Sequence, residues 1–498
     1  MEDSITEEVA IQLDEKLGSL SLRSEETDNP ISDVVAIQLD EKLGSPSLGS
    51  EEMENPISDG VAIQLDEKLG SFCLRSEESF IFRVPHQLRR INEKAYEPHI
   101  ISIGPYHRGK QHLRGMEIHK LHYLKMFLQQ RNENVGKYVD AMRAMEADAR
   151  ACYDQAVDDD VSPEAFVEMM LLDGCFIVQL IVRSMTDEFG ENYCDDFVKA
   201  NQSSLMHDLL LLENQLPFFV LLKLFDMMNC KNMLPNNCQE AYFVPMLLIN
   251  FASIMPGPGL LWHKPSGGQN VKHLLGLVHD HLLPSSQGMQ RYWPKKGNFE
   301  PERWRFIRCA SELREAGIKF EKIKVEQKYK KVEVEGDSLF DISFDKGKMM
   351  IPTLSIYADT ERLFRNLMAY EQFIIGRPTF VADYVTFMDS LINSGKDVEI
   401  LCRRGIITNW LGDDEVVATM FNRLRDFSSP PRYNFYYAKA FDDINKHCKQ
   451  RRNIWKAKLR HDYCNTPWAM ISFVAASALL LLALAQTIFS ILAYSKGK

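Results

Sequence analysis

A long uncharged stretch near the C-terminal end limits most strongly how this chain can fold. From Trp468 to Tyr494 it reads WAMISFVAASALLLLALAQTIFSILAY, and Gln486 is its only strongly polar residue. About 20 apolar residues let a helix cross the hydrocarbon core of a membrane. The alternative is a buried core helix, but such helices rarely reach this length without a polar face. We predict one transmembrane helix at 467–494 and a short tail at 495–498.

The charges beside this stretch predict its orientation. Five basic residues lie within 451–460, whereas only Lys496 and Lys498 follow the stretch. An excess of Lys and Arg marks the cytosolic side of a span. Residues 1–32 contain no early basic cluster and no apolar run of signal-peptide length. We therefore predict a single-pass, tail-anchored membrane protein with a cytosolic body, in either the plasma membrane or an endomembrane.

The N-terminal arm, residues 1–60, is acidic and repetitive. The chain has a net charge of −11, and residues 1–79 hold 20 Asp and Glu but 5 Lys and Arg. The segment VAIQLDEKLGS occurs at Val9–Ser19, Val35–Ser45 and Val61–Ser71, with a period of 26 residues. In each copy apolar residues recur every four positions, which places them on one face of a short helix.

Two interpretations of these repeats stay open. They are either extra copies of a helix that binds a partner or another copy of the chain, or a partly disordered extension that the protein can lose. Helices of this length are marginal alone in water. We expect the third copy to dock on the body.

Residues 61–434 are expected to form a large, mostly helical body. Helical patterns run over 116–130, 138–157, 165–183, 204–228, 305–316, 360–376, 381–394, 398–404 and 413–424. The third is apolar on nearly all sides, which predicts a central helix. The fourth contains the run DLLLLENQLPFFVLLKLF, which predicts a second buried helix, bent or broken at Pro217. Glu213, Asn214 and Gln215 lie inside that run and need polar partners or an exposed turn. Residues 255–268 and 283–301 are expected to be loops.

Two other segments break the helical pattern of the body. Residues 318–357 carry alternating and β-branched residues, which predicts a small antiparallel β element with a hairpin turn at 345–347. Residues 435–466 predict a basic juxtamembrane helix. Its cations either attract anionic lipid, at roughly 1 kcal/mol each near the surface, or serve only as a topology signal. The fold class is thus mainly α, with a small β element and one C-terminal transmembrane helix.

The remaining composition excludes several classes of protein. The ten cysteines are scattered without a CxxC pair, which favours free thiols over a disulfide framework. No dense Lys and Arg stripe with interleaved aromatic residues occurs in the body, so nucleic acid is not an expected partner.

No catalytic or cofactor-binding motif is present. The chain lacks GxGxxG, GxxxxGK[ST], GxSxG and HExxH patterns, so we predict no catalytic residue, no cofactor and no metal, and expect no enzyme. The best metal candidates are His107, His112, His119 and His122. His119 and His122 lie one turn apart on a predicted helix, but no Cys or carboxylate stands nearby at a structural-zinc spacing. The triplet at 279–281, His-Asp-His, is a weaker candidate.

Seven motifs follow one another along the body. They are IFRVP (Ile81–Pro85), YEPHIISIGPYHRG (Tyr96–Gly109), LRGMEIHKLHYLKMFL (Leu113–Leu128), MLLDGCFIVQL (Met170–Leu180), DLLLLENQLPFFVL (Asp208–Leu221), ASELREAGIKF (Ala310–Phe320) and IPTLSIYADTERLFRNLMAYEQ (Ile351–Gln372). In this order, with the C-terminal span, they resemble the plant family catalogued as domain of unknown function 247. The resemblance runs from about Val61 to the end, and the copies at 9–19 and 35–45 depart from the family's usual single N-terminal segment.

This resemblance implies a plant, membrane-associated protein without a settled biochemical activity. Some grass members are linked to pollen-side self-incompatibility, which suggests recognition or signalling. We therefore expect a membrane-anchored plant protein that acts through protein–protein contacts with an unidentified partner. The alternative is an enzyme with an unrecognised active site around His107, His119 and His122, which in one version depends on a metal.

Overall fold

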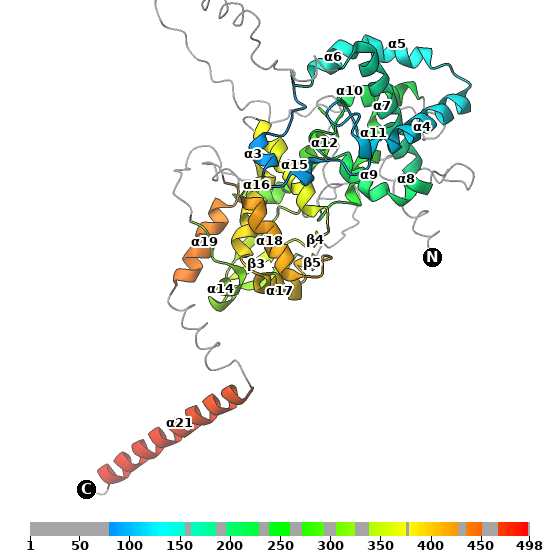
Figure 1. The fold of residues 1–498 in the computed structure, drawn as a ribbon. Coiled ribbons are helices and arrows are strands. Elements are labelled where there is room, and N and C mark those ends of the chain that lie inside the picture. Colours follow the sequence, from blue (N-terminus) through cyan, green and yellow to red (C-terminus); the bar gives the residue numbers. More distant parts are fainter. Residues whose placement is uncertain are drawn as a thin grey trace, which may run out of the picture. The chain divides into compact units, whose positions relative to one another are not determined.

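The computed structural model describes most of the body and the C-terminal helix (Figure 1). The described residues are 79–154, 161–185, 196–228, 239–258, 271–292, 305–323, 338–374, 378–426, 435–450 and 467–496. The N-terminal arm and its three repeats lie outside them, so the predictions for 1–60 and for docking of the third copy stay predictions. The described part is mainly helical, as the sequence indicates.

Helix α7 (Pro163–Met185) forms the centre of the first group of helices. Between Phe166 and Val182 every residue except Glu168 is buried. The helix contacts α4 (Gly115–Arg131), α5 (Gly136–Ala144), α10 (Phe218–Met227) and α11 (Gln239–Ala252). Because a helix that is apolar on all sides must be covered on all sides, this arrangement confirms the predicted central helix.

A second group of helices packs around α18. Its members are α14 (Ala310–Glu315), α15 (Thr360–Phe373), α16 (Phe380–Leu391), α17 (Gly395–Arg403) and α18 (Asp414–Arg425). Helix α18 contacts α15, α16 and α17. The smaller helices are α3 (His86–Arg89), η1 (Glu93–Tyr96), η2 (Gln111–Leu113), α6 (Glu146–Ala151), α8 (Asp196–Ala200), α9 (Gln202–Asp208), α12 (Leu274–His281) and α13 (Ser286–Tyr292).

Several predicted segments differ in extent from the structure. The helix expected over 305–316 begins only at Ala310. The helix expected over 138–157 is divided at Met145 into α5 and α6. The break expected at Pro217 in the helix over 204–228 is confirmed, because α10 begins directly after Pro217, whose ring and missing N–H favour the start of a helix over its interior. The break is longer than expected and includes residues 209–217. The loop expected over 283–301 contains α13.

The β structure is mixed rather than purely antiparallel. Strands β1 (Lys319–Lys322), β2 (Ser343–Asp345) and β3 (Lys348–Ile351) form one sheet in the order β1-β3-β2. The predicted hairpin joins β2 to β3, and its turn residues Lys346 and Gly347 have φ of 45° and 80°, as a two-residue type I′ turn requires. Strand β1, however, pairs with β3 in parallel.

A second, two-stranded sheet was not predicted. Strand β4 (Leu354–Ile356) pairs in parallel with β5 (Ile407–Asn409). The antiparallel prediction was therefore wrong for these two pairings. Their strands have three or four residues and are joined by long connections, so no turn sequence announces which strands pair.

Helix α19 (Ala438–Lys449) is shorter than the basic helix predicted over 435–466. The backbone is extended at Gln450, where the helix ends. Phe441 and Ile444 are fully buried, and the Phe441 ring packs against Phe387 of α16 with 5.4 Å between centroids. This part of the segment therefore belongs to the body. Residues 451–466 lie outside the described residues.

Helix α21 (Pro467–Lys496) covers the predicted span. Its stretch Val474–Leu492 has a mean hydropathy of 2.1, and none of it is buried. The stretch Pro163–Ser184 of α7 is nearly as hydrophobic, at 2.0, but 89% of it is buried. Length and composition alone therefore allow both helices to span a membrane, and burial is what separates them.

Candidate functional site

Four polar side chains are buried at the end of α9 and in the segment that follows it before α10. Asp208, Glu213, Asn214 and Gln215 are each at most 2% exposed. A buried polar group is costly unless it has a hydrogen-bonding partner. The partners of these four side chains lie mainly in residues 81–109, more than 100 positions earlier in the chain, and in α15. The segment 208–215 therefore connects distant motifs of the sequence.

Asp208 holds the backbone of residues 99–101. Its carboxylate accepts hydrogen bonds from the amides of His99, Ile100 and Ile101 at 3.0, 2.7 and 3.0 Å. The guanidinium of Arg362, in α15, donates to the same carboxylate at 2.7 Å. Three amides and one cation thus compensate a carboxylate that is fully buried.

Asn214 and Gln215 continue this attachment. The Asn214 side chain accepts from the Ile103 amide at 2.6 Å and donates to the Ile101 carbonyl at 3.0 Å, much as a neighbouring strand would. Gln215 donates to the carbonyls of Leu209 and Leu211 at 2.8 and 2.7 Å, which closes the turn before Pro217. The polar residues predicted to need partners therefore have them.

Gly104 lies against the backbone of this turn, at the carbonyl group of Gln215. Its φ is +72°, and a Cβ atom there would stand 2.5 Å from the Gln215 carbonyl oxygen. The Gly104 amide donates to Asp173 of α7 at 2.9 Å. Lys120 of α4 donates to the same carboxylate and to the Ser102 carbonyl, at 2.6 Å each. Burial raises the pKa of Asp173, although Lys120 acts in the opposite direction.

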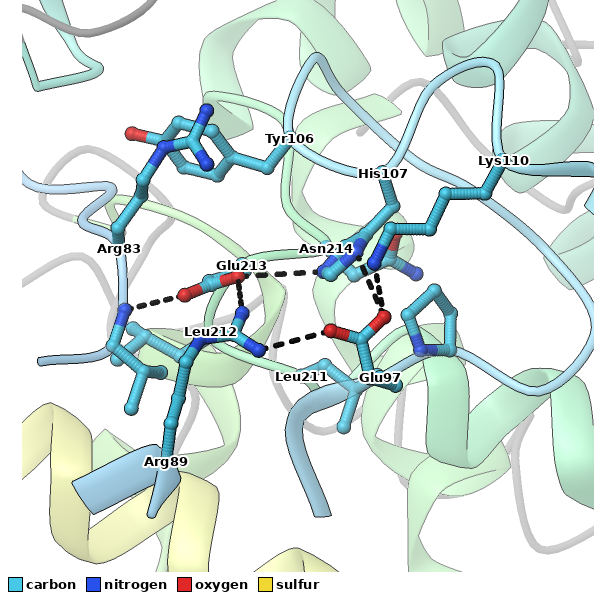
Figure 2. A network of polar contacts seen from close by, with 12 residues as sticks. Arg83, Arg89, Glu97, Tyr106, His107, Lys110, Leu211, Leu212, Glu213 and Asn214 are labelled. Carbon is cyan, nitrogen blue, oxygen red and sulfur yellow. Dashed lines mark hydrogen bonds and ion pairs between the residues drawn. The ribbon is translucent and has the colours of Figure 1, made fainter. Parts of the chain in front are cut away.

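His107 lies at the end of this network, between two carboxylates. Figure 2 shows its ring pointing between Glu97 and Glu213. Nδ1 is 3.5 Å from the Glu97 carboxylate, and Nε2 is 3.5 Å from that of Glu213. Neither ring nitrogen has a hydrogen bond, and the side chain is only 1% exposed.

Two cations balance the charges around this ring. Arg89 donates to Glu97 at 2.9 Å and also to Glu213, and Lys110 donates to Glu97. Burial opposes ionisation of Glu97, but the hydrogen bonds from Lys110 and Arg89 outweigh it and lower its pKa to about 2. Burial, reinforced by Lys110, lowers the pKa of His107 to about 3. At neutral pH the imidazole is therefore uncharged.

The carboxylates of this network already accept hydrogen bonds from backbone and guanidinium groups, which limits the reactions that they could catalyse. Glu213 accepts from the Val84 amide as well as from Arg89, and burial raises its pKa. A carboxylate beside an uncharged imidazole is an acid–base pair in principle. Here the carboxylates fix backbone and guanidinium groups, and the ring between them is closed to solvent. The geometry is that of a structural clamp, which we call the 208–215 clamp.

The histidines proposed from the sequence do not meet. The ring of His112 contacts the Pro98 carbonyl at 3.2 Å, and that of His119 stacks on Phe197 at 5.1 Å. His122 is exposed, and His107 is buried in the clamp. Within the described ranges, no group of three or more His, Cys, Asp or Glu could hold a metal ion.

The triplet at 279–281 also has structural partners. His279 lies 3.1 Å from Glu371, which accepts from the Val381 and Ala382 amides at 2.9 Å each and so caps α16. Burial opposes protonation of His279, but the neighbouring carboxylates of Asp280, at 3.5 Å, and Glu371, at 3.1 Å, raise its pKa to about 9. A charged histidine thus sits beside the carboxylate that begins α16.

Comparison with known proteins places these residues in a family context. A family model described as a plant protein of unknown function, DUF247, matches residues 81–482. The UPF0481 protein At3g47200 of Arabidopsis thaliana is 30% identical over 438 residues, 84% of this chain and 87% of that protein. The putative UPF0481 protein At3g02645 of the same plant is 22% identical over 491 residues, 81% and 88% of the two chains. No solved structure matches.

Proposed function

The chain belongs to DUF247, a family of plant proteins of unknown function, so its function has to be inferred from its own residues. We propose that it is a membrane-anchored protein that acts in recognition or signalling through protein–protein contacts. The observation that carries this proposal is helix α21. It is as hydrophobic as α7, the buried central helix of the first group, yet none of its stretch Val474–Leu492 is buried.

The dimensions of α21 suit a bilayer. Its 30 residues extend about 45 Å at 1.5 Å per residue, which exceeds a hydrocarbon core of about 30 Å. Leu479, Leu480, Leu481 and Leu482 are each 66–68% exposed. Burying such a side chain is worth about 1.5–3 kcal/mol, so a bilayer stabilises this helix far better than water does. The basic residues at 451–460 favour a cytosolic body.

A contact function agrees with the way the body uses its polar groups. The clamp side chains hold backbone, so they are committed to structure. At the surface, by contrast, Ile118 is 72% and Trp410 65% exposed, and the Trp410 ring stacks on Tyr357 with 5.9 Å between centroids. Exposed Trp and Tyr are frequent anchors in protein interfaces.

Membrane fractionation tests the anchor. The full chain is compared with a form that ends at residue 466, and both are extracted with alkaline carbonate after expression in plant cells. We expect the full chain to stay in the membrane pellet and the shortened form to be released. Release of both forms would contradict the proposal, because a peripheral protein is stripped by this treatment.

The second candidate is an enzyme with an active site around His107. The observation in its favour is that both ring nitrogens lack hydrogen bonds while two carboxylates face them. Catalysis would require Lys110 and Glu97, which are partly exposed, to move aside. Metal analysis of the purified full chain and of His107→Gln tests the metal-dependent version. Stoichiometric metal that His107→Gln loses would favour this candidate, and a metal-free chain would remove its metal-dependent version.

A further inference from the structure

We infer that α21 carries an interaction surface for a second copy of the same helix, centred on the side chain of Gln486. This inference rests on the proposed insertion of α21 into a membrane. It adds to that proposal a specific partner, another molecule of this chain, and a specific face of the helix.

Gln486 is the residue that the bilayer leaves without a hydrogen bond. Its side chain is exposed and lies inside the apolar stretch Val474–Leu492. The neighbouring Thr487 hydroxyl donates to the Ala483 carbonyl of its own helix at 2.7 Å. Within the described residues, the side-chain amide group of Gln486 makes no hydrogen bond. Because the hydrocarbon core contains no water to bond it, the amide requires a partner from outside the helix.

The residues around Gln486 allow a second helix to approach. Positions spaced alternately by three and four residues fall on one face of a helix. On this face lie Ser472, Ala476, Leu479, Ala483, Gln486 and Ser490. All but Leu479 and Gln486 are small, and small residues let two membrane helices pack closely.

The opposite side of α21 differs in character. Val474, Leu481, Ile488 and Leu492 lie there and are 50–68% exposed. These larger aliphatic side chains suit contact with lipid tails. The helix is thus asymmetric, with one face for lipid and one face that combines small residues with the unpaired amide.

A second copy of α21 satisfies the amide by symmetry. A glutamine side chain both donates and accepts hydrogen bonds, so two Gln486 side chains facing each other can pair. Two copies anchored by the same C-terminal helix insert in the same direction, which brings both Gln486 residues to the same depth. A two-fold symmetric pair is also the commonest assembly of identical chains.

Fluorescence resonance energy transfer between full-length chains tests this inference. Chains labelled at the C-terminus with donor or acceptor fluorophores are reconstituted together in phosphatidylcholine vesicles and diluted with lipid. We expect transfer that persists on dilution for the wild type. Gln486→Leu and Ala483→Ile are expected to weaken association at least about threefold, whereas Leu481→Ile, on the lipid face, is expected to leave it unchanged and Gln486→Asn to retain most of it.

The controls separate this inference from the anchor on which it rests. Each variant is first checked for resistance to carbonate extraction. If the wild type is extracted, the anchor itself is wrong. If the wild type is inserted but its transfer equals that of a monomeric single-span protein, or if Gln486→Leu and Leu481→Ile behave alike, pairing through Gln486 is refuted. Transfer seen only when other plant membrane proteins are present would also overturn it, because the partner would then be a different span.

Discussion

Single residues in the 208–215 clamp form the hydrogen bonds that hold distant motifs of this chain in contact. Glu213, Asn214 and Gln215 interrupt an apolar run. Because burying a polar side chain without a hydrogen bond is costly, these three residues require hydrogen-bonding partners. Their need was predictable from the sequence, but their partners were not. Asn214 bonds Ile103 and Glu213 bonds Val84, 111 and 129 positions away, and no local pattern encodes such a separation.

Gly104 provides the sharpest test at the residue scale. We expect Gly104→Ala to lower the free energy of unfolding more than Gly109→Ala does. Both positions have positive φ, +72° and +84°, and that conformation costs an alanine about 1–2 kcal/mol. Only Gly104 faces a carbonyl oxygen at 2.5 Å, whereas nothing lies within 4 Å of Gly109. Denaturant unfolding of both variants measures the difference, and equal losses would show that the Gln215 contact is not a constraint.

His107 predicts a dependence of stability on pH. Its pKa is about 3 in the folded chain against an ordinary 6.5, so only the unfolded chain takes up a proton between these values. Stability from the uncharged ring is complete above pH 6.5 and is lost as the pH falls toward 3. We expect His107→Gln to lose less stability than the wild type between pH 6.5 and 4.5 in thermal unfolding.

A matched control for this experiment is His122→Gln, which changes an exposed histidine of α4. It should follow the pH dependence of the wild type. If His107→Gln also follows the wild type, the buried ring does not stay uncharged in the folded protein, and the account of the two carboxylates around it is wrong.

At the scale of elements, Asp208 joins the end of α9 to residues 99–101 and to α15. We expect Asp208→Ala to destabilise the body by about 3–5 kcal/mol, because it leaves the Arg362 guanidinium and three amides without their acceptor. Asp226→Ala, at an exposed position of α10, should change stability by less than about 0.5 kcal/mol. Urea unfolding followed by circular dichroism compares the two, and a similar small effect of both would refute the clamp.

Elements were predictable to the extent that local patterns define them. The periodicity of 116–130, 165–183 and 381–394 matches α4, α7 and α16 closely, since long apolar patterns determine helices. The division of 138–157 at Met145 and the pairing of β4 with β5 were missed. Met145 is not a typical helix-breaking residue, and short parallel strands depend on contacts between distant segments rather than on a turn sequence.

At the scale of the whole molecule, the family and the mainly helical class followed from motifs and periodicity, and the match over residues 81–482 confirms the family. The role of α21 needs an argument from its surroundings, because α7 has nearly the same hydropathy. A helix covered by others contributes to a core, and a helix left uncovered requires an apolar solvent. This contrast is why we propose α21, and not α7, as the membrane-spanning helix.

Protease protection in sealed vesicles tests this assignment most directly. The full chain carries one tag before Met1 and one after Lys498, and protease is added outside vesicles that retain their cytosolic face outward. We predict that the N-terminal tag and the body are digested while a fragment containing α21 and the C-terminal tag survives until detergent is added. Digestion of both tags without detergent would contradict a membrane-spanning α21, and protection of the body would contradict its cytosolic orientation.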